Sequence, residues 1–110
     1  MSKYGARKDT YDGKTFDSQK EAQRYAELRL LERGGVISDL RCQEKFEMIP
    51  SQKWHGKTVE KSVSYIADFT YIDKSTGEFV VEDTKGFKTK DYIIKRKLML
   101  YVHGIRIREV

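Results

Sequence analysis

Two stretches of alternating apolar residues, 65–72 and 78–85, are joined by a short polar segment that contains Gly77. Alternation with a period of two is typical of β-strands, and a short connection with glycine joins strands that run antiparallel. If the turn is centred in the joining segment, Asp68 of the first strand lies directly opposite Asp83 of the second. We therefore expect the chain to fold around an antiparallel hairpin that brings two aspartates together.

The residues around these aspartates predict a metal site. Because side chains alternate between the two faces of a strand, Asp68, Asp83 and Lys85 share one face. Two facing carboxylates lie roughly 5 Å apart at Cβ and repel each other. A hard cation such as Mg²⁺, which prefers oxygen ligands, offsets that repulsion, and Lys85 could hold an attacking water or stabilise charge on a phosphate. The other residues expected on this face are Ile66, Thr70, Ile72, Phe79 and Val81.

Two alternatives to the metal site remain open at the level of sequence. Asp83 and Lys85 could form a salt bridge at an exposed end of the sheet, with no further role. The register could also slip by one residue, which would turn Asp83 away and make Glu82 the acid that faces Asp68. We favour Asp83 because it shares a face with Lys85.

The remaining pattern predicts an α/β (α+β) fold in one domain, residues 1–110, with a mixed sheet between two helices. Helix signals begin at Asp17-Ser18 and end at Gly34-Gly35. The segment between the first two long strands is polar and reads as a loop or a long hairpin tip. The expected order is an N-terminal hairpin (10–16), a helix (18–33), strands (40–49, 62–72 and 78–84), a helix (89–102) and a short strand near the end.

Glu21 has two interpretations. Ser18 followed by Glu21 matches a capping box at a helix start, a contribution of about 1 kcal/mol at most. Glu21 is also a candidate for the active site, on the resemblance described below. The apolar part of the helix comprises Ala22, Tyr25, Ala26, Leu28, Leu30 and Leu31.

The formal net charge of +5 favours polyanionic partners such as nucleic acid. The commoner role of a basic run on a helix is a solvated face, so this signal is modest. The candidate DNA-binding residues are Lys3, Arg7, Lys8, Lys88, Lys90, Lys95 and Arg96.

Other residues narrow the chemistry. The single cysteine, Cys42, alternates with Leu40 and is expected in the core, while His55 and His103 lack metal-ligand spacing. Trp54 could stack on a base or cover an edge of the core. Glu44 could border the site or be solvated. The lone cysteine, the polar N-terminus and the lack of a long apolar run favour the cytoplasm, that of a bacterial host if a phage encodes the chain.

An acid on one strand followed by acid-x-Lys on the next resembles the PD-(D/E)XK nuclease superfamily. The resemblance extends to Phe-Asp-Ser-x-x-Glu-Ala at 16–22, Ala-Asp-Phe at 67–69 and Val-Glu-Asp-x-Lys-Gly at 81–86, and so covers most of the chain. The chain as a whole resembles a small phage-associated branch of unknown function. Relatives of similar build include archaeal Holliday-junction resolvases and the Tn7-type transposase cleavage subunit. Ala67 stands where the superfamily's proline would be.

This resemblance implies a restriction-endonuclease-like fold and a Mg²⁺-dependent endonuclease, with Mn²⁺ able to substitute. Glu21, Asp68 and Asp83 would hold the metal and Lys85 would complete the catalytic set. The expected substrate is DNA, branched or double-stranded and read by shape, as in a Holliday junction during recombination. Two cuts across a symmetric junction would suit a homodimer. The alternative is a nucleic-acid-binding protein that keeps a nuclease scaffold without catalysis.

Overall fold

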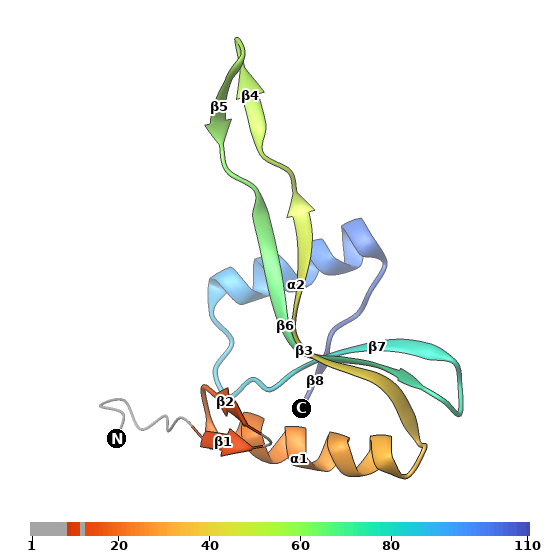
Figure 1. Ribbon diagram of the computed structural model, residues 1–110. Helices are drawn as coiled ribbons and strands as arrows, with labels where there is room; N and C mark the ends of the chain where they lie inside the picture. The colour runs from red at the N-terminus through yellow and green to blue at the C-terminus, as the bar shows by residue number, and fades with distance from the viewer. Residues whose placement is uncertain (1–8, 12) are drawn as a thin grey trace.

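Figure 1 shows the computed structural model, which describes residues 9–11 and 13–110. Two helices, α1 (Gln19–Arg33) and α2 (Lys90–His103), flank a four-stranded sheet with the strand order β3-β6-β7-β8. The β3–β6 and β6–β7 pairs are antiparallel, whereas β7 and β8 are parallel, so the sheet is mixed and the expected α+β fold is confirmed. Its strands are β3 (Ile37–Ile49), β6 (Val63–Asp73), β7 (Glu78–Asp83) and β8 (Arg108–Glu109).

Two small hairpins complete the order of elements. Strands β1 (Asp9–Tyr11) and β2 (Lys14–Phe16) form the N-terminal hairpin that the sequence predicts. Strands β4 (Gln52–Trp54) and β5 (Lys57–Glu60) pair with each other and continue the line of β3 and β6 away from both helices (Figure 1). The segment expected to be a loop or hairpin tip is therefore a projecting two-stranded arm.

One core cluster lies between α1 and the sheet. Ala22, Tyr25 and Leu28 follow one another at helical spacing and are buried. The Tyr25 ring lies 5.0 Å from that of Phe16 and 6.2 Å from that of Phe69. This packing holds the first turn of α1, which contains Glu21, against β6.

The exposed side of α1 differs from the expectation in one residue. Leu30 was expected in the apolar part of the helix, but its side chain is exposed. Leu28 and Leu31 lie on the face toward the sheet. Because one helical turn takes 3.6 residues, Leu30, two positions after Leu28, points to the opposite side of the helix.

A second core cluster lies between α2 and the sheet. Tyr92 and Met99 of α2 are buried there with Val81 of β7 and Ile107 just before β8. The helix begins at an N-cap, Thr89, whose hydroxyl accepts a hydrogen bond from the Tyr92 amide. The backbone amide of Val110 also donates to the carbonyl of Asp83, 3.0 Å away, so the last residues secure the end of β7.

The long β3–β6 ladder bends at its middle. Asp39 and Gln43 of β3 have φ values of 55° and 56°, a left-handed conformation that is uncommon for residues other than glycine. The register shifts between Ser38 and Arg41, as expected for a β-bulge near Asp39. Gln43 lies opposite Asp68, because its neighbours pair with the neighbours of Asp68.

This bend changes which face of β6 is buried. Tyr65 and Ala67 pack in the cluster beneath α2, whereas Phe69 and Tyr71 pack in the cluster beneath α1. Strict alternation would keep all four on one side, so the change occurs at Asp68. The expectation of one continuous face through Ile66, Asp68, Thr70 and Ile72 is therefore wrong, since Ile66 is exposed and Thr70 is fully buried.

Among the described residues, neither helix combines the length and the apolar character that crossing a bilayer demands.

Candidate active site

The β6–β7 hairpin has the register that the sequence predicts. Phe69 pairs with Glu82, which makes Asp68 and Asp83 the next facing residues along the two strands. The turn is fixed by Gly77, whose φ is 76°, and by the Asp73 carboxylate, which accepts a hydrogen bond from the Ser75 amide at 2.9 Å. A glycine tolerates this positive φ without strain, so the turn chemistry sets the register.

Three acids meet at the end of this hairpin. Asp68 comes from β6, Asp83 from β7, and Glu21 from the first turn of α1. Glu21 is only 6% exposed and Asp83 only 1%. The sequence residues expected to form the site are thus brought together by three separate elements.

Glu21 takes part in both of the roles considered for it. Its backbone amide donates to the Ser18 hydroxyl at 3.1 Å, which is one half of a capping box. Its carboxylate, however, turns toward the sheet, where it accepts a hydrogen bond from Gln43 Nε2 at 3.3 Å and interacts with Asp68. Helix capping therefore fixes the backbone position of Glu21, but it does not explain why the carboxylate points toward the sheet.

Neighbouring polar groups hold the other two carboxylates. The Thr84 amide and hydroxyl both donate to Asp68 Oδ2, at 2.8 and 2.7 Å, and the Tyr65 hydroxyl donates to Asp83 Oδ2. Sequence reasoning did not identify Thr84, Tyr65 or Gln43 as site residues. Thr84 is the middle residue of the acid-x-Lys triplet, which was a usable signal, but the bend that brings in Tyr65 and Gln43 has no glycine to mark it.

The electrostatics of the cluster favour shared protons. Burial raises the pKa of Glu21 to about 7, with further contributions from the charges of Asp68 and Asp17. Burial also raises the pKa of Asp83 to about 7, reinforced by a carboxyl–carboxyl hydrogen bond with Asp68 and opposed by Tyr65 and Lys85. Close carboxylates cannot all ionise at once unless another positive charge compensates them.

Lys85 lies beside this cluster. Its Nζ is 3.3 Å from Asp83 Oδ1 and 4.6 Å from the centre of the Tyr92 ring. This contact is an ion pair without hydrogen-bond geometry, because Asp83 Oδ1 is buried and accepts no hydrogen bond from any described residue. A salt bridge between the two residues thus exists, but Asp83 is buried and does not form the exposed sheet end that the alternative assumed.

The donor set suits a hard divalent cation. It consists of carboxylate oxygens, which Mg²⁺ prefers, and it leaves one buried Asp83 oxygen without a hydrogen bond. In the described part of the chain, no three His, Cys, Asp or Glu side chains converge tightly enough to coordinate an ion as they stand. Metal binding would require the acidic side chains to move closer together, and Glu21 and Asp83, whose pKa values are raised, to lose their protons.

Glu82 points away from the cluster. Its carboxylate accepts hydrogen bonds from Arg24 Nε and Nη2 of α1, at 2.8 and 2.7 Å, and from the Tyr71 hydroxyl. It therefore lies on the face covered by α1, opposite to Asp83. The one-residue register slip considered above is excluded in this structure.

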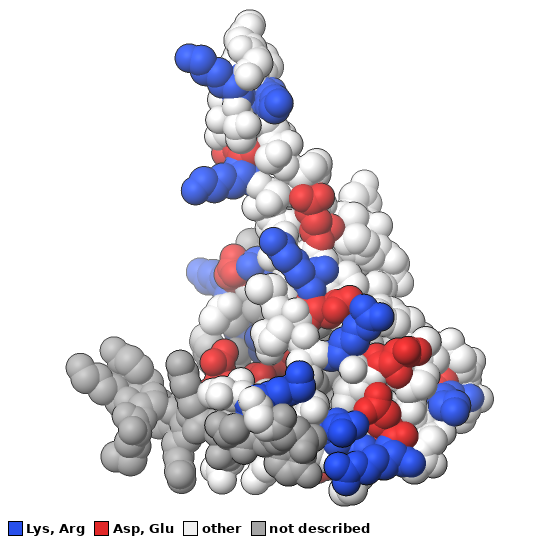
Figure 2. All heavy atoms as spheres, in the orientation of Figure 1, with Lys and Arg blue, Asp and Glu red and all other residues white. Residues whose placement is uncertain are grey.

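The basic residues expected to contact DNA are largely paired with acids. Lys88 and Arg96 both approach the Glu109 carboxylate, at 3.7 and 3.0 Å, and Lys95 lies 3.4 Å from Asp91. Lys90 is exposed. Lys3, Arg7 and Lys8 lie outside the described residues. Figure 2 shows acidic and basic side chains interspersed over the body of the molecule on the face in view.

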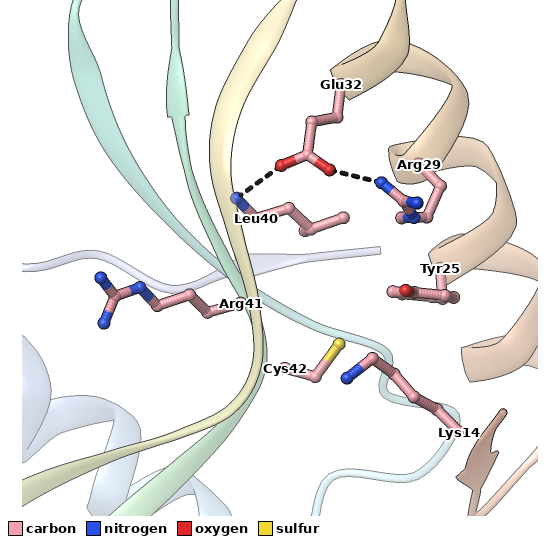
Figure 3. A pocket seen from close by; sticks show the side chains of 7 residues that line it. All are labelled: Lys14, Tyr25, Arg29, Glu32, Leu40, Arg41 and Cys42. Carbon is pink, nitrogen blue, oxygen red and sulfur yellow. Dashed lines mark hydrogen bonds and ion pairs between the residues drawn. The ribbon is translucent and has the colours of Figure 1, made fainter. Parts of the chain in front are cut away.

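Cys42 borders a separate hollow between α1 and β3 (Figure 3). The cavity is about 330 Å³, and the Glu32 carboxylate bridges it by accepting from the Leu40 amide at 3.1 Å and from Arg29 at 2.7 Å. Cys42 is half-buried against the α1 core, and this burial raises the pKa of its thiol. The sequence predicts a core position for Cys42, and the side chain packs against the edge of the α1 cluster.

Three other residues lie outside the acidic cluster. Glu44 approaches Arg41 at 3.9 Å, while its neighbour Gln43 reaches the site in its place. His55 and His103 are exposed, and Nε2 of His103 lies 2.7 Å from the Glu47 carbonyl.

The described residues thus form a mixed α+β fold with a buried acidic cluster beside a lysine, at the edge of a hairpin under α1. The chain belongs to the DUF1064 family, described as "Protein of unknown function", which it matches over residues 1–108. No curated protein and no solved structure matches the chain.

Proposed function

We propose that this protein is a metal-dependent endonuclease of the PD-(D/E)XK type that hydrolyses DNA phosphodiester bonds. The observation that carries the proposal is the meeting of Glu21, Asp68 and Asp83 with Lys85 beside them. Glu21 and Asp83 are buried carboxyl groups with raised pKa values, and such groups cost stability and concentrate at functional sites.

Asp68 and Asp83 would hold Mg²⁺ between β6 and β7, with Glu21 completing the set from α1. When bound, the ion supplies neutralising charge at the scissile phosphate and lowers the pKa of the attacking water. Thr84 and Tyr65 donate hydrogen bonds to the two aspartates and so keep their remaining oxygens oriented.

Lys85 has the reach and the charge to act on the reacting phosphate. Its ammonium group lies at the margin of the cluster, held by Asp83 on one side and by the Tyr92 ring on the other. From this position it would orient the attacking water and stabilise the negative charge that builds on the phosphate oxygens in the transition state.

DNA is the preferred substrate because the chain carries a net charge of +5, which favours polyanions. A small fold with few elements to spare for reading base edges favours recognition of DNA shape, such as a branch or a Holliday junction. Cutting a symmetric junction on both sides would require two active sites and hence a homodimer.

A second candidate is a nucleic-acid-binding protein without catalysis. It is favoured by the present side-chain geometry, in which no three acids of the described residues converge on a ready-made metal position. In that case the acidic cluster would have no catalytic role, and DNA binding would not depend on Mg²⁺.

The deciding experiment is incubation of the protein with labelled branched, linear and single-stranded substrates, with EDTA, Mg²⁺ or Mn²⁺. The expected result is metal-dependent cleavage, highest on branched DNA and lost in Asp83→Asn. The matched control is Asp91→Asn, which removes an exposed carboxylate at the start of α2 whose ion pair among the described residues is with Lys95. Binding without cleavage under all metal conditions would support the second candidate.

A further inference from the structure

The β4–β5 arm contributes nothing to either core cluster. Every residue from 50 to 62 is exposed, including Trp54 at 69% and Val59 at 57%. A two-stranded hairpin without a packed face is marginally stable by itself. The arm continues the line of the β3–β6 ladder and leaves its surface free to contact a partner.

The arm carries more basic than acidic charge. Lys53, Lys57 and Lys61 lie along it with Glu60 as the only acid between residues 50 and 62. None of these lysines has an ion-pair partner among the described residues, in contrast to Lys88 and Lys95 on the body. In Figure 2 blue side chains stand out from the arm at the top of the view, and the arm contains lysine but no arginine.

The aromatic residue of the arm lies next to these charges. Trp54 pairs across the ribbon with Lys57, so the indole and the ammonium project from the same face. The His55 ring lies 5.1 Å from the indole at an interplanar angle of 85°. An exposed aromatic flanked by unpaired cations suits a surface that presents both phosphates and stacked or sugar groups.

The arm also has a length that matches duplex DNA. Lys57 and Asp68 are eleven residues apart on nearly continuous strand, which corresponds to a span of up to about 36 Å. One turn of B-form DNA measures about 34–36 Å. The major groove, about 12 Å wide, admits a two-stranded β-ribbon.

We infer that the β4–β5 arm, residues 50–62, binds duplex DNA. The contact lies about one helical turn from the phosphodiester bond that the acidic cluster would cleave. Lys53, Lys57 and Lys61 contact phosphates, and Trp54 lies against the groove. The choice of duplex DNA rests on the proposed function. The observation that the arm is exposed and basic does not rest on that function, and the experiment tests DNA binding by the arm separately from cleavage.

Trp54 is the only tryptophan in the chain, so its fluorescence reports on the arm alone. The test uses the Asp83→Asn protein in EDTA, which removes cleavage from the measurement. Addition of duplex of about two helical turns should change the emission of Trp54 and protect it from acrylamide, and added salt should reverse both effects. DNA anisotropy recorded on the same samples reports overall binding independently.

Variants define the contribution of each residue. Lys57→Ala should lower the slope of log affinity against log salt by about 1. Lys74→Ala is the matched control, because Lys74 is also an exposed lysine but lies in the β6–β7 turn at the other end of the sheet. The loss caused by Trp54→Ala should be several-fold on duplex of about two helical turns and smaller on duplex of about 8 base pairs, which is too short to contact the arm and the acidic cluster at once.

Three outcomes overturn the inference. DNA binding without any change in Trp54 emission would mean that the arm is not in contact. Equal salt slopes for Lys57→Ala and Lys74→Ala would mean that charge on the arm is not used. A response of Trp54 to vesicles of anionic phospholipid but not to duplex would assign the arm to a membrane surface instead. If Trp54 responds to duplex but the parent protein cuts no substrate with any metal, the arm stands and the nuclease proposal fails.

Discussion

Arg24 of α1 and Glu82 of β7 form a two-point ion pair, with Nε 2.8 Å from Oε1 and Nη2 2.7 Å from Oε2. Glu82 is fully buried, and Arg24 also reaches the exposed Glu27 at 3.0 Å. Bidentate geometry of this kind is specific as well as strong. The pair ties α1, and with it Glu21, to the strand that carries Asp83.

Glu82→Gln should destabilise the protein by about 3 kcal/mol, because it leaves Arg24 facing a buried neutral group. Glu27→Gln removes the other partner of Arg24 and should cost under about 1 kcal/mol, since that pair is exposed. Urea denaturation measures both. The folded fraction of Glu82→Gln should still cleave within a few-fold of the parent. Loss of Mg²⁺ binding in Glu82→Gln, with binding kept in Asp83→Asn, would contradict the site assignment.

Asp83→Asn should abolish cleavage without destabilising the metal-free protein. The asparagine resembles the protonated carboxyl that the raised pKa of Asp83 favours, and its oxygen can still accept from Tyr65. Circular dichroism melts at pH 8 in EDTA should give an equal or higher melting temperature than the parent. A clearly lower one would favour a purely structural Asp83–Lys85 salt bridge.

The metal-free protein should lose stability as the pH rises. Glu21 and Asp83 have pKa values raised to about 7, whereas unfolded carboxyls titrate near 4. Between these values the folded state binds more protons than the unfolded state, so unfolding becomes easier from about pH 4.5 to pH 7 and levels off above. Urea midpoints at pH 5 and pH 8 test this, and saturating Mg²⁺ should reverse the order because metal binding needs ionised carboxylates.

Proton release gives a second measure of the same linkage. Addition of Mg²⁺ at about pH 6 should release protons from Glu21 and Asp83, and release should diminish toward pH 8. Calorimetry in buffers of different ionisation enthalpy counts them. Asp83→Asn should lower the count, whereas Asp91→Asn, on the exposed start of α2, should leave it unchanged. Metal binding with no proton release at pH 6 would show that these acids are not its ligands.

Lys85→Ala should lower the cleavage rate about 10²-fold or more, because its ammonium group acts mainly in the transition state. Magnesium affinity at pH 8 should change little, since lysine is not a ligand for a hard cation. Lys85 lowers the pKa of Asp83, so its loss should move the pH dependence of metal binding upward. Lys74→Ala, which removes an exposed lysine from the β6–β7 turn, is the control for nonspecific loss of positive charge.

The sequence predicts the structure around one half of β6 better than that around the other half. The β6–β7 register is local, since Gly77 and Asp73 fix a short turn, and from it Asp68 and Asp83 are correctly placed opposite each other. The β3–β6 bend is not local. It arises where Gln43 adopts a positive φ that glutamine does not signal, and tertiary packing decides this conformation.

The same bend explains the errors in the candidate site. Glu44 was considered for the site by strand alternation, but the backbone at Gln43 breaks that alternation and brings Gln43 to Glu21. Tyr65 reaches Asp83 for a related reason, since it belongs to the α2 cluster and not to the face of Phe69. Residues held by turns were predictable, whereas residues held by a long-range distortion were not.

The tie between Val110 and Asp83 has a consequence for biosynthesis. Domains fold progressively as the chain leaves the ribosome. Glu21, Asp68 and Asp83 emerge well before β8, yet β7 gains its parallel neighbour only through Arg108 and Glu109. A chain in which β8 has not yet paired would therefore expose β7, the strand that carries Asp83, as an open sheet edge.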